Sequence, residues 1–206
     1  AAEGLAEAER YVDLVRKLAR PPTPSLIAVG GLSGTGKTTL AHALAPTIGN
    51  APGAVVVRSD VLRKRRHGVD LFSKLPEKAY TRVESAAVYE ELFATVAGCL
   101  ASGVTVIADA VFRNADERAA IRDVAAAAGV PFAGIWLEVS DATQDDRLRR
   151  RMHDVSDATV AIGRAQRDNA GPVSDWPALN ADKPLADLRQ DAATILADAG
   201  VSVTEG

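Results

Sequence analysis

Apolar residues follow two alternating patterns along this chain of 206 residues. Some stretches are mostly apolar, as expected for strands buried on both faces of a sheet. These stretches are residues 25–30, 54–58, 104–109, 132–139 and 176–180. Between them, apolar residues recur every three or four positions, which is the period of a helix. The alternation predicts an α/β fold in which a five-stranded parallel sheet carries helices on both faces.

The helical pattern covers residues 39–44, 77–101, 114–128, 158–169 and 185–199. Gly129 is well suited to end one of these helices, because glycine tolerates the left-handed conformation found there. An arginine-rich helix follows Asp141, which is a suitable N-cap residue, and residues 152–157 interrupt it. We therefore expect residues 141–170, approximately, to form a small helical lid.

The first 24 residues differ from the rest of the chain. Residues 2–20 place apolar side chains on one helical face, and Pro21, Pro22 and Pro24 then end the helix. This pattern predicts a helix and a proline-rich connector over residues 1–24, followed by one domain over residues 25–206. The helix could dock onto a preceding domain, or it could be an outer helix of this one.

Composition excludes several classes of partner. The net charge is −3 and the pI is about 5.7, so no overall basic field attracts nucleic acid or a membrane surface. Nucleic acid is therefore expected only as a substrate, held by a local cluster. Cys99 is the single cysteine, which fits a reducing, cytoplasmic compartment. No apolar run is long enough to cross a bilayer.

The stretch GLSGTGKT, from Gly31 to Thr38, matches the P-loop pattern G-x-x-x-x-G-K-[ST] between a strand and a helix. Its glycines let successive N–H groups turn toward a phosphate, and the following helix adds its positive end. The expected phosphate-binding residues are Gly31, Leu32, Ser33, Gly34, Thr35, Gly36, Lys37, Thr38 and Thr39. Lys37 would neutralise the β- and γ-phosphates, and the Thr38 hydroxyl would bind Mg²⁺. The alternative is a glycine-rich turn that only connects two elements.

Two carboxylates follow predicted strands. Asp109 ends residues 104–109 and is a candidate Mg²⁺ ligand, whereas Asp60 follows residues 54–58 and is a candidate general base for an acceptor hydroxyl. Either could instead be a helix N-cap. No stretch specifies adenine, so the choice between ATP and GTP is open, although residues 182–184 are well placed for the base.

Several arginines are candidate phosphate or substrate ligands. Arg147 and Arg151 are four residues apart, so both would project from one face of the lid toward the developing charge. Arg63 opens a basic run that ends at His67, directly after Asp60, and it favours an anionic acceptor over a polycation. Weaker candidates for substrate binding are Arg113 and Arg118. Solvated basic surface is the alternative for all of them.

Taken together, the stretches GGLSGTGKTTLA, RSDVLRKR, VIADAVFRNADERAAI, PFAGIWLEVS, RLRRR and SDATVAIGRAQ are similar to a known family. They resemble the P-loop kinases of the nucleoside-monophosphate-kinase-like group. The resemblance is strongest to the ATP-binding C-terminal domain of bifunctional aminoglycoside phosphotransferase/ATP-binding proteins. Phage-type polynucleotide kinase, zeta toxins and gluconate kinase are more distant relatives.

The resemblance implies a three-layer P-loop NTPase fold. It also implies roles for individual residues: Asp60 acts on the acceptor hydroxyl, Arg63 helps to hold the substrate, and Arg147 and Arg151 form the lid pair. The N-terminal helix resembles a junction to an upstream phosphotransferase-like domain, which would make this chain a fragment. The aminoglycoside label would belong to that other domain.

The expected function is that of an ATP- and Mg²⁺-dependent kinase. It would transfer the γ-phosphoryl group to a hydroxyl of a small molecule or of a nucleic-acid 5′ end. The alternative is a regulatory ATP-binding module that hydrolyses slowly and switches a fused phosphotransferase through closure of its lid. The sequence determines neither the acceptor nor the oligomeric state.

Overall fold

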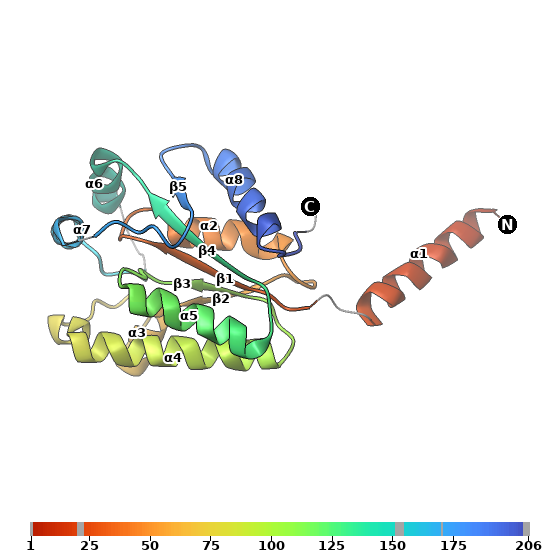
Figure 1. Cartoon of the computed structure of the whole chain (residues 1–206), viewed down its shortest axis with the longest axis horizontal. Coiled ribbons are helices and arrows are strands. Elements are labelled where there is room, and N and C mark those ends of the chain that lie inside the picture. The colour runs from red at the N-terminus through yellow and green to blue at the C-terminus, as the bar shows by residue number, and fades with distance from the viewer. Residues whose placement is uncertain (1, 20–22, 151–154, 170, 204–206) are drawn as a thin grey trace.

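A computed structural model of the chain describes residues 2–19, 23–150, 155–169 and 171–203. It confirms the α/β fold, with one fully parallel five-stranded sheet in the order β2-β3-β1-β4-β5 (Figure 1). The strands are β1 (Leu26–Gly31), β2 (Val55–Arg58), β3 (Val106–Asp109), β4 (Phe132–Glu138) and β5 (Ala178–Asn180). β4 begins at the predicted residue, and each of the other strands begins one or two residues after its predicted start.

Helices cover both faces of the sheet (Figure 1). On one face lie α2 (Lys37–Leu44), which continues into the 3-10 turn η1 (Ala45–Thr47), and α8 (Leu185–Asp198). On the other lie α3 (Ser59–Arg66), α4 (Arg82–Ala101) and α5 (Ala115–Ala128). Each interface is an apolar cluster, with Leu40 and Ile135 buried in the first, and Leu92 and Ile121 buried in the second. The three-layer arrangement predicted from the alternating pattern is therefore confirmed.

Sheet register determines where the site can form. Val29 of β1 and Arg58 of β2 are both aligned with Asp109 of β3; β2 and β3 end there, and β1 continues two residues further, to Gly31. In an open parallel sheet, ligands bind beyond the carboxyl ends of the strands. The P-loop, the start of α3 and Asp109 therefore lie along the same edge.

Two predicted elements differ in their ends. The helix predicted over residues 77–101 is divided into a 3-10 turn, η2 (Glu77–Tyr80), and α4, because the Thr81 side chain caps α4 by accepting from the N–H of Glu84 (3.3 Å). Asp141 is the first residue of α6 (Asp141–Arg150) and not its cap; instead, the Ser140 hydroxyl accepts from the N–H of Thr143 (3.3 Å). The predicted end of α5 is confirmed at Gly129, which has a φ of 65°.

The described part of the predicted lid consists of α6 and α7 (Val160–Asp168) with the segment before α7. The two helices pack together through Asp145, which accepts hydrogen bonds from Arg164 (2.6 Å) and Arg167 (3.0 Å). These two guanidinium groups hold the pKa of Asp145 below its usual value. Two ion pairs to the buried carboxylate of Asp145 therefore join these helices.

Helix α1 (Ala2–Ala19) lies apart from the sheet and its covering helices (Figure 1). Its apolar side chains at Leu5, Tyr11, Val12 and Val15 are exposed. The origin of this N-terminal segment, and the upstream domain, stay predictions. Among the described residues, no helix combines the length and the apolar character needed to cross a bilayer.

Candidate functional site

The P-loop connects the end of β1 to the start of α2. Gly31 has a φ of 138° and Gly34 a φ of 88°, both in the region that residues with a Cβ rarely adopt. A Cβ on Gly31 would also lie 2.7 Å from the carbonyl oxygen of Leu137. The loop therefore needs glycine at Gly31 both for its backbone angle and for its contact with β4.

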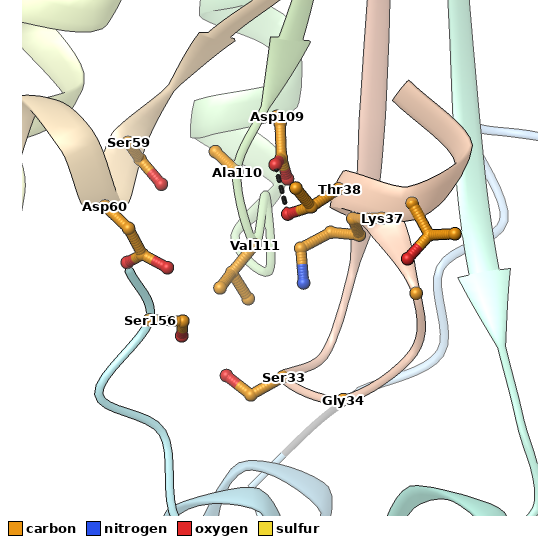
Figure 2. Close-up of a pocket in the computed structure, with 12 residues that line it drawn as sticks. Ser33, Gly34, Lys37, Thr38, Ser59, Asp60, Asp109, Ala110, Val111 and Ser156 are labelled. Carbon is orange, nitrogen blue, oxygen red and sulfur yellow. Dashed lines mark hydrogen bonds between the residues drawn. The ribbon is translucent and has the colours of Figure 1, made fainter. Parts of the chain in front are cut away.

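Lys37, the first residue of α2, points into the space enclosed by the loop (Figure 2). Its Nζ donates to the carbonyl of Leu32 (2.9 Å), and the Thr35 hydroxyl donates to the same carbonyl (2.9 Å). An ammonium group at the N-terminus of a helix adds to the positive end of the helix dipole. The combination favours a bound polyanion.

Thr38 and Asp109 meet across the gap between α2 and β3. The Thr38 hydroxyl donates to Oδ2 of Asp109 (2.6 Å), and Arg58 Nε contacts the same oxygen at 3.3 Å. Asp109 is thus not a helix N-cap. Threonine and carboxylate oxygens suit Mg²⁺, which usually binds few protein groups and takes its other ligands from phosphates and water. The pair would supply two such protein ligands. Among the described residues, no group of three or more His, Cys, Asp or Glu side chains could hold a metal.

A cavity of about 150 Å³ joins these groups to Asp60. Its walls come from the P-loop and α2, from Ser59 and Asp60 at the start of α3, from Asp109 to Val111, and from Ser156. Figure 2 shows Lys37 and Thr38 on one side of the cavity, with Asp60 and Ser156 on the other. Asp60 lies within the first turn of α3, whose N-cap is Arg58, so Asp60 is not the cap either.

The charge on Asp60 is disfavoured by its surroundings. Burial raises the pKa of its carboxyl group, and the negative charge of Asp109 raises it further. A hydrogen bond from Ser156 and the charges of Lys37 and Arg58 act in the opposite direction but are outweighed. A raised pKa in a cavity is a property shared by many catalytic acids and bases.

A second cavity, of about 350 Å³, adjoins the P-loop and shares Gly34, Gly36 and Thr39 with the first. Its remaining walls include Arg147 of α6, and Lys183, Leu185 and Leu188 in and after the loop that follows β5. The P-loop therefore borders both cavities. Residues 182–184, predicted to lie near a nucleotide base, contribute Lys183 to the second one.

The predicted lid arginines have different outcomes. Arg147 does not line the first cavity; its guanidinium donates to the carbonyls of Thr35 (2.9 Å) and Ala181 (2.7 Å) and lines the second. It joins the P-loop to the loop after β5 and does not face Asp60 across the cavity. Arg151 lies outside the described residues.

The three arginines predicted to bind substrate do not line either cavity. Arg63 is buried, donates to the carbonyl of Ala79 (2.6 Å) and lies over the ring of Tyr80. Arg118 is buried in an ion pair with Asp175 (2.9 Å) and also donates to the carbonyls of Phe112 and Arg113. The Arg113 side chain is exposed. A buried guanidinium group needs hydrogen-bond acceptors. The buried side chains of Arg63 and Arg118 therefore bind carbonyl and carboxylate groups of the protein itself.

Two glutamines at the P-loop were not predicted. Gln166 of α7 accepts from the N–H of Ser33 (2.9 Å), and Gln144 of α6 donates to the carbonyl of Ser33. The two helices of the predicted lid thus contact the backbone of Ser33 in the P-loop. No local pattern distinguishes these glutamines from surface residues. Arg58 and Ser156 were missed for the same reason, since both face the site only through tertiary contacts.

Proteins similar to this chain occur in mycobacteria. Uncharacterized proteins of Mycobacterium tuberculosis and Mycobacterium bovis are each 30% identical over 178 residues, covering 84% of this chain and 34% of the relative. The chain therefore spans about a third of the length of the curated relatives it matches.

Solved structures share the fold. A sugar kinase from Janibacter sp. superposes with a TM-score of 0.64 at 19% identity, covering 84% of this chain and 95% of that one. A gluconokinase from Sinorhizobium meliloti gives 0.60 at 22%, covering 85% and 93%. The APS kinase of Mycobacterium tuberculosis, solved with AMPPNP and APS, gives 0.63 at 21%, covering 86% and 99%.

Residues 26–173 match the AAA domain family AAA_33, and the match spans the P-loop, Asp60, Asp109 and the lid. The chain therefore belongs to the AAA_33 family of AAA domains, and its fold is that of the P-loop kinases.

Proposed function

We propose that this domain is an ATP- and Mg²⁺-dependent kinase that transfers the γ-phosphoryl group to a hydroxyl of a small molecule or of a nucleic-acid 5′ end. One observation carries the proposal: a single cavity has the phosphate-binding groups Lys37 and Thr38 on one side and the carboxylate of Asp60 on the other. Phosphoryl transfer requires this arrangement of positive charge on one side and an oriented acceptor on the other.

Each group has a distinct role in the proposed reaction. Lys37 and the P-loop N–H groups bind the phosphate oxygens and stabilise negative charge as transfer proceeds. Thr38 and Asp109 would hold Mg²⁺, which neutralises charge on the phosphates when it is bound. Asp60 accepts the proton of the acceptor hydroxyl. Its raised pKa brings that carboxylate closer to the pH at which general bases are effective.

The second cavity is the proposed site for the nucleotide base. It adjoins the P-loop and carries the apolar side chains of Leu185 and Leu188 beside Lys183. Apolar walls with a few polar groups are typical of sites for small planar ligands. A nucleotide seated there would extend its phosphates over Gly34 and Gly36, which border both cavities.

Replacing Arg147 with alanine is expected to weaken nucleotide binding about tenfold, because it removes two charged hydrogen bonds between the P-loop and the loop after β5. Titration calorimetry with Mg²⁺ and ATP measures the effect. Arg150→Ala is the control, since Arg150 lies on the same helix but pairs with Asp146 at the surface. Equal affinities of the two variants would contradict a role for Arg147 at the base side.

The proposed function is tested by offering the chain Mg²⁺ and γ-labelled ATP together with sugars, nucleosides or oligonucleotides. Label transferred to an acceptor, and absent when Lys37 is replaced by alanine, supports the kinase. Hydrolysis without any transfer would favour the regulatory module instead. A parallel series with GTP determines which purine is preferred.

A further inference from the structure

The segment of the predicted lid that precedes α7 is held by groups of α3 and of the residues between α3 and α4. Its residue Asp157 accepts hydrogen bonds from the Lys64 ammonium (2.8 Å), the Leu75 N–H (2.9 Å) and the Tyr80 hydroxyl (2.6 Å). We call Lys64, Leu75 and Tyr80 the Asp157 socket. Lys64 belongs to α3, whose first turn carries Asp60, and the other two lie between α3 and α4.

Lys64 shows that this contact is built into the fold. Its side chain is 1% exposed, and a buried ammonium is costly unless it has a charged partner and further acceptors. Asp157 supplies the charge, and the carbonyl of Ser73 accepts a second hydrogen bond. Burial alone would raise the pKa of Asp157, but the hydrogen bonds from Lys64, Tyr80 and Leu75 outweigh it and hold that pKa below its usual value. The carboxylate therefore stays charged.

The socket is itself supported by the basic run that follows Asp60. The Arg63 guanidinium lies 4.9 Å from the centre of the Tyr80 ring, whose hydroxyl donates to Asp157. Burial, followed by the hydrogen bond to Asp157, raises the pKa of Tyr80, so its hydroxyl keeps the proton that it donates. Two residues of the run, Arg63 and Lys64, thus serve the contact with the lid segment.

Anchoring Asp157 also places its neighbour. Ser156 lines the first cavity on the same side as Asp60 (Figure 2), and a hydrogen bond from its side chain acts to lower the pKa of the Asp60 carboxyl group. Residues 155–157 therefore contact two residues of α3: Asp157 pairs with Lys64, and Ser156 lies beside the candidate base Asp60, four residues before Lys64. A buried ion pair of this kind is suited to setting register between two segments.

We propose that Ser156 is a positioning residue for Asp60, and that the Lys64–Asp157 pair acts through it by holding residues 155–157 against α3. This inference rests on the proposed function, because Asp60 is its general base. The Ser156 hydroxyl restricts the rotation of the Asp60 carboxylate and favours its charged form. Asp60 also interacts electrostatically with four other groups: Lys37, Arg58, Asp109 and Tyr80. Of the groups that act on Asp60 here, only Ser156 belongs to residues 155–157.

The test compares acceptor-dependent transfer by the unchanged chain, Ser156→Ala, Ser156→Thr and Asp157→Asn. Ser156→Ala and Asp157→Asn are expected to lower kcat about tenfold, the scale of one hydrogen bond to a charged group, while the Kd for Mg²⁺-nucleotide stays within about twofold. Ser156→Thr keeps the hydroxyl and should retain most of the activity. In an Asp60→Asn background, Ser156→Ala should have no further effect, because residues that act through one group are not additive.

Glu91→Gln is the matched control for Asp157→Asn, since Glu91 also joins an α3 cation, Arg66, but at the surface (3.4 Å). It should transfer at the unchanged rate. Asp157→Asn leaves Lys64 without its charged partner, so the melting temperature of this variant is measured as well. Ser156→Ala keeps the Lys64–Asp157 pair, and it therefore tests the inference even if Asp157→Asn unfolds. If the unchanged chain transfers phosphate and Ser156→Ala keeps its kcat, the inference alone is overturned. If the unchanged chain binds nucleotide but transfers to no acceptor, the proposed function fails and the inference falls with it.

Discussion

Lys37→Ala is expected to lower the rate of phosphoryl transfer about 10³-fold. This is the upper end of the range for removing one group that stabilises charge in the transition state. The ammonium is the charged group at the centre of the P-loop, held there by the carbonyl of Leu32. Lys37→Arg should not restore activity, because the wider planar guanidinium cannot occupy the position of a compact ammonium. Rates are measured with Mg²⁺, ATP and the acceptor identified in the screen.

Lys78→Ala is the control for Lys37→Ala, because Lys78 is an exposed lysine outside both cavities. Its transfer rate and its nucleotide affinity should equal those of the unchanged chain. Titration calorimetry should also show weaker binding of Mg²⁺-nucleotide by Lys37→Ala alone. Equal rates and equal affinities for the two variants would show that the P-loop does not bind the nucleotide phosphates as proposed.

Asp60→Asn is expected to lower transfer about 10²- to 10⁴-fold, the range for loss of a general base. Nucleotide affinity should be retained, because Asp60 lies on the acceptor side of the cavity, across from Lys37. Asp123→Asn, at an exposed position on α5, is the matched control and should leave the rate unchanged. Transfer by Asp60→Asn at the unchanged rate would overturn the assignment of the base.

The same variant has an expected effect on stability that distinguishes catalysis from folding. The pKa of Asp60 is raised above its ordinary value of 3.8, so the folded state binds this proton more tightly than the unfolded state does. Stability therefore falls as pH rises through the interval between these two pKa values, and the deficit persists above it. Asparagine carries no charge, so Asp60→Asn should melt no lower than the unchanged chain near neutral pH. A clear fall in its melting temperature would show that the lost activity has a structural cause.

Local sequence was sufficient for most of the fold. Strands buried on both faces are nearly all apolar, and the glycine, lysine and threonine of the P-loop are needed for local reasons, so both features could be read from short windows. The end of α5 at Gly129 was predictable for the same reason. The strand order β2-β3-β1-β4-β5 depends on contacts between distant segments, and no window of sequence contains it.

The basic run after Asp60 shows where local sequence was insufficient. Four consecutive cationic residues, Arg63 to Arg66, followed by His67, indicate either a solvated surface or a site for an anionic acceptor. In the structure Arg63 is buried over Tyr80, and Lys64 is buried against Asp157, which lies 93 residues later. The partner of a charge is determined by which segments the fold brings together, and charge patterns along the chain carry no such information.

The chain thus encodes its phosphate-binding loop, its strands and the positions of Asp60 and Asp109 in short segments, because backbone angles and apolar burial are local requirements. Tertiary structure decided which polar groups meet: Ser156 with Asp60, Asp157 with Lys64, and Arg147 with the carbonyls of Thr35 and Ala181. The physical reason is that a buried polar group must find a partner, and the nearest partner in space is seldom near in sequence.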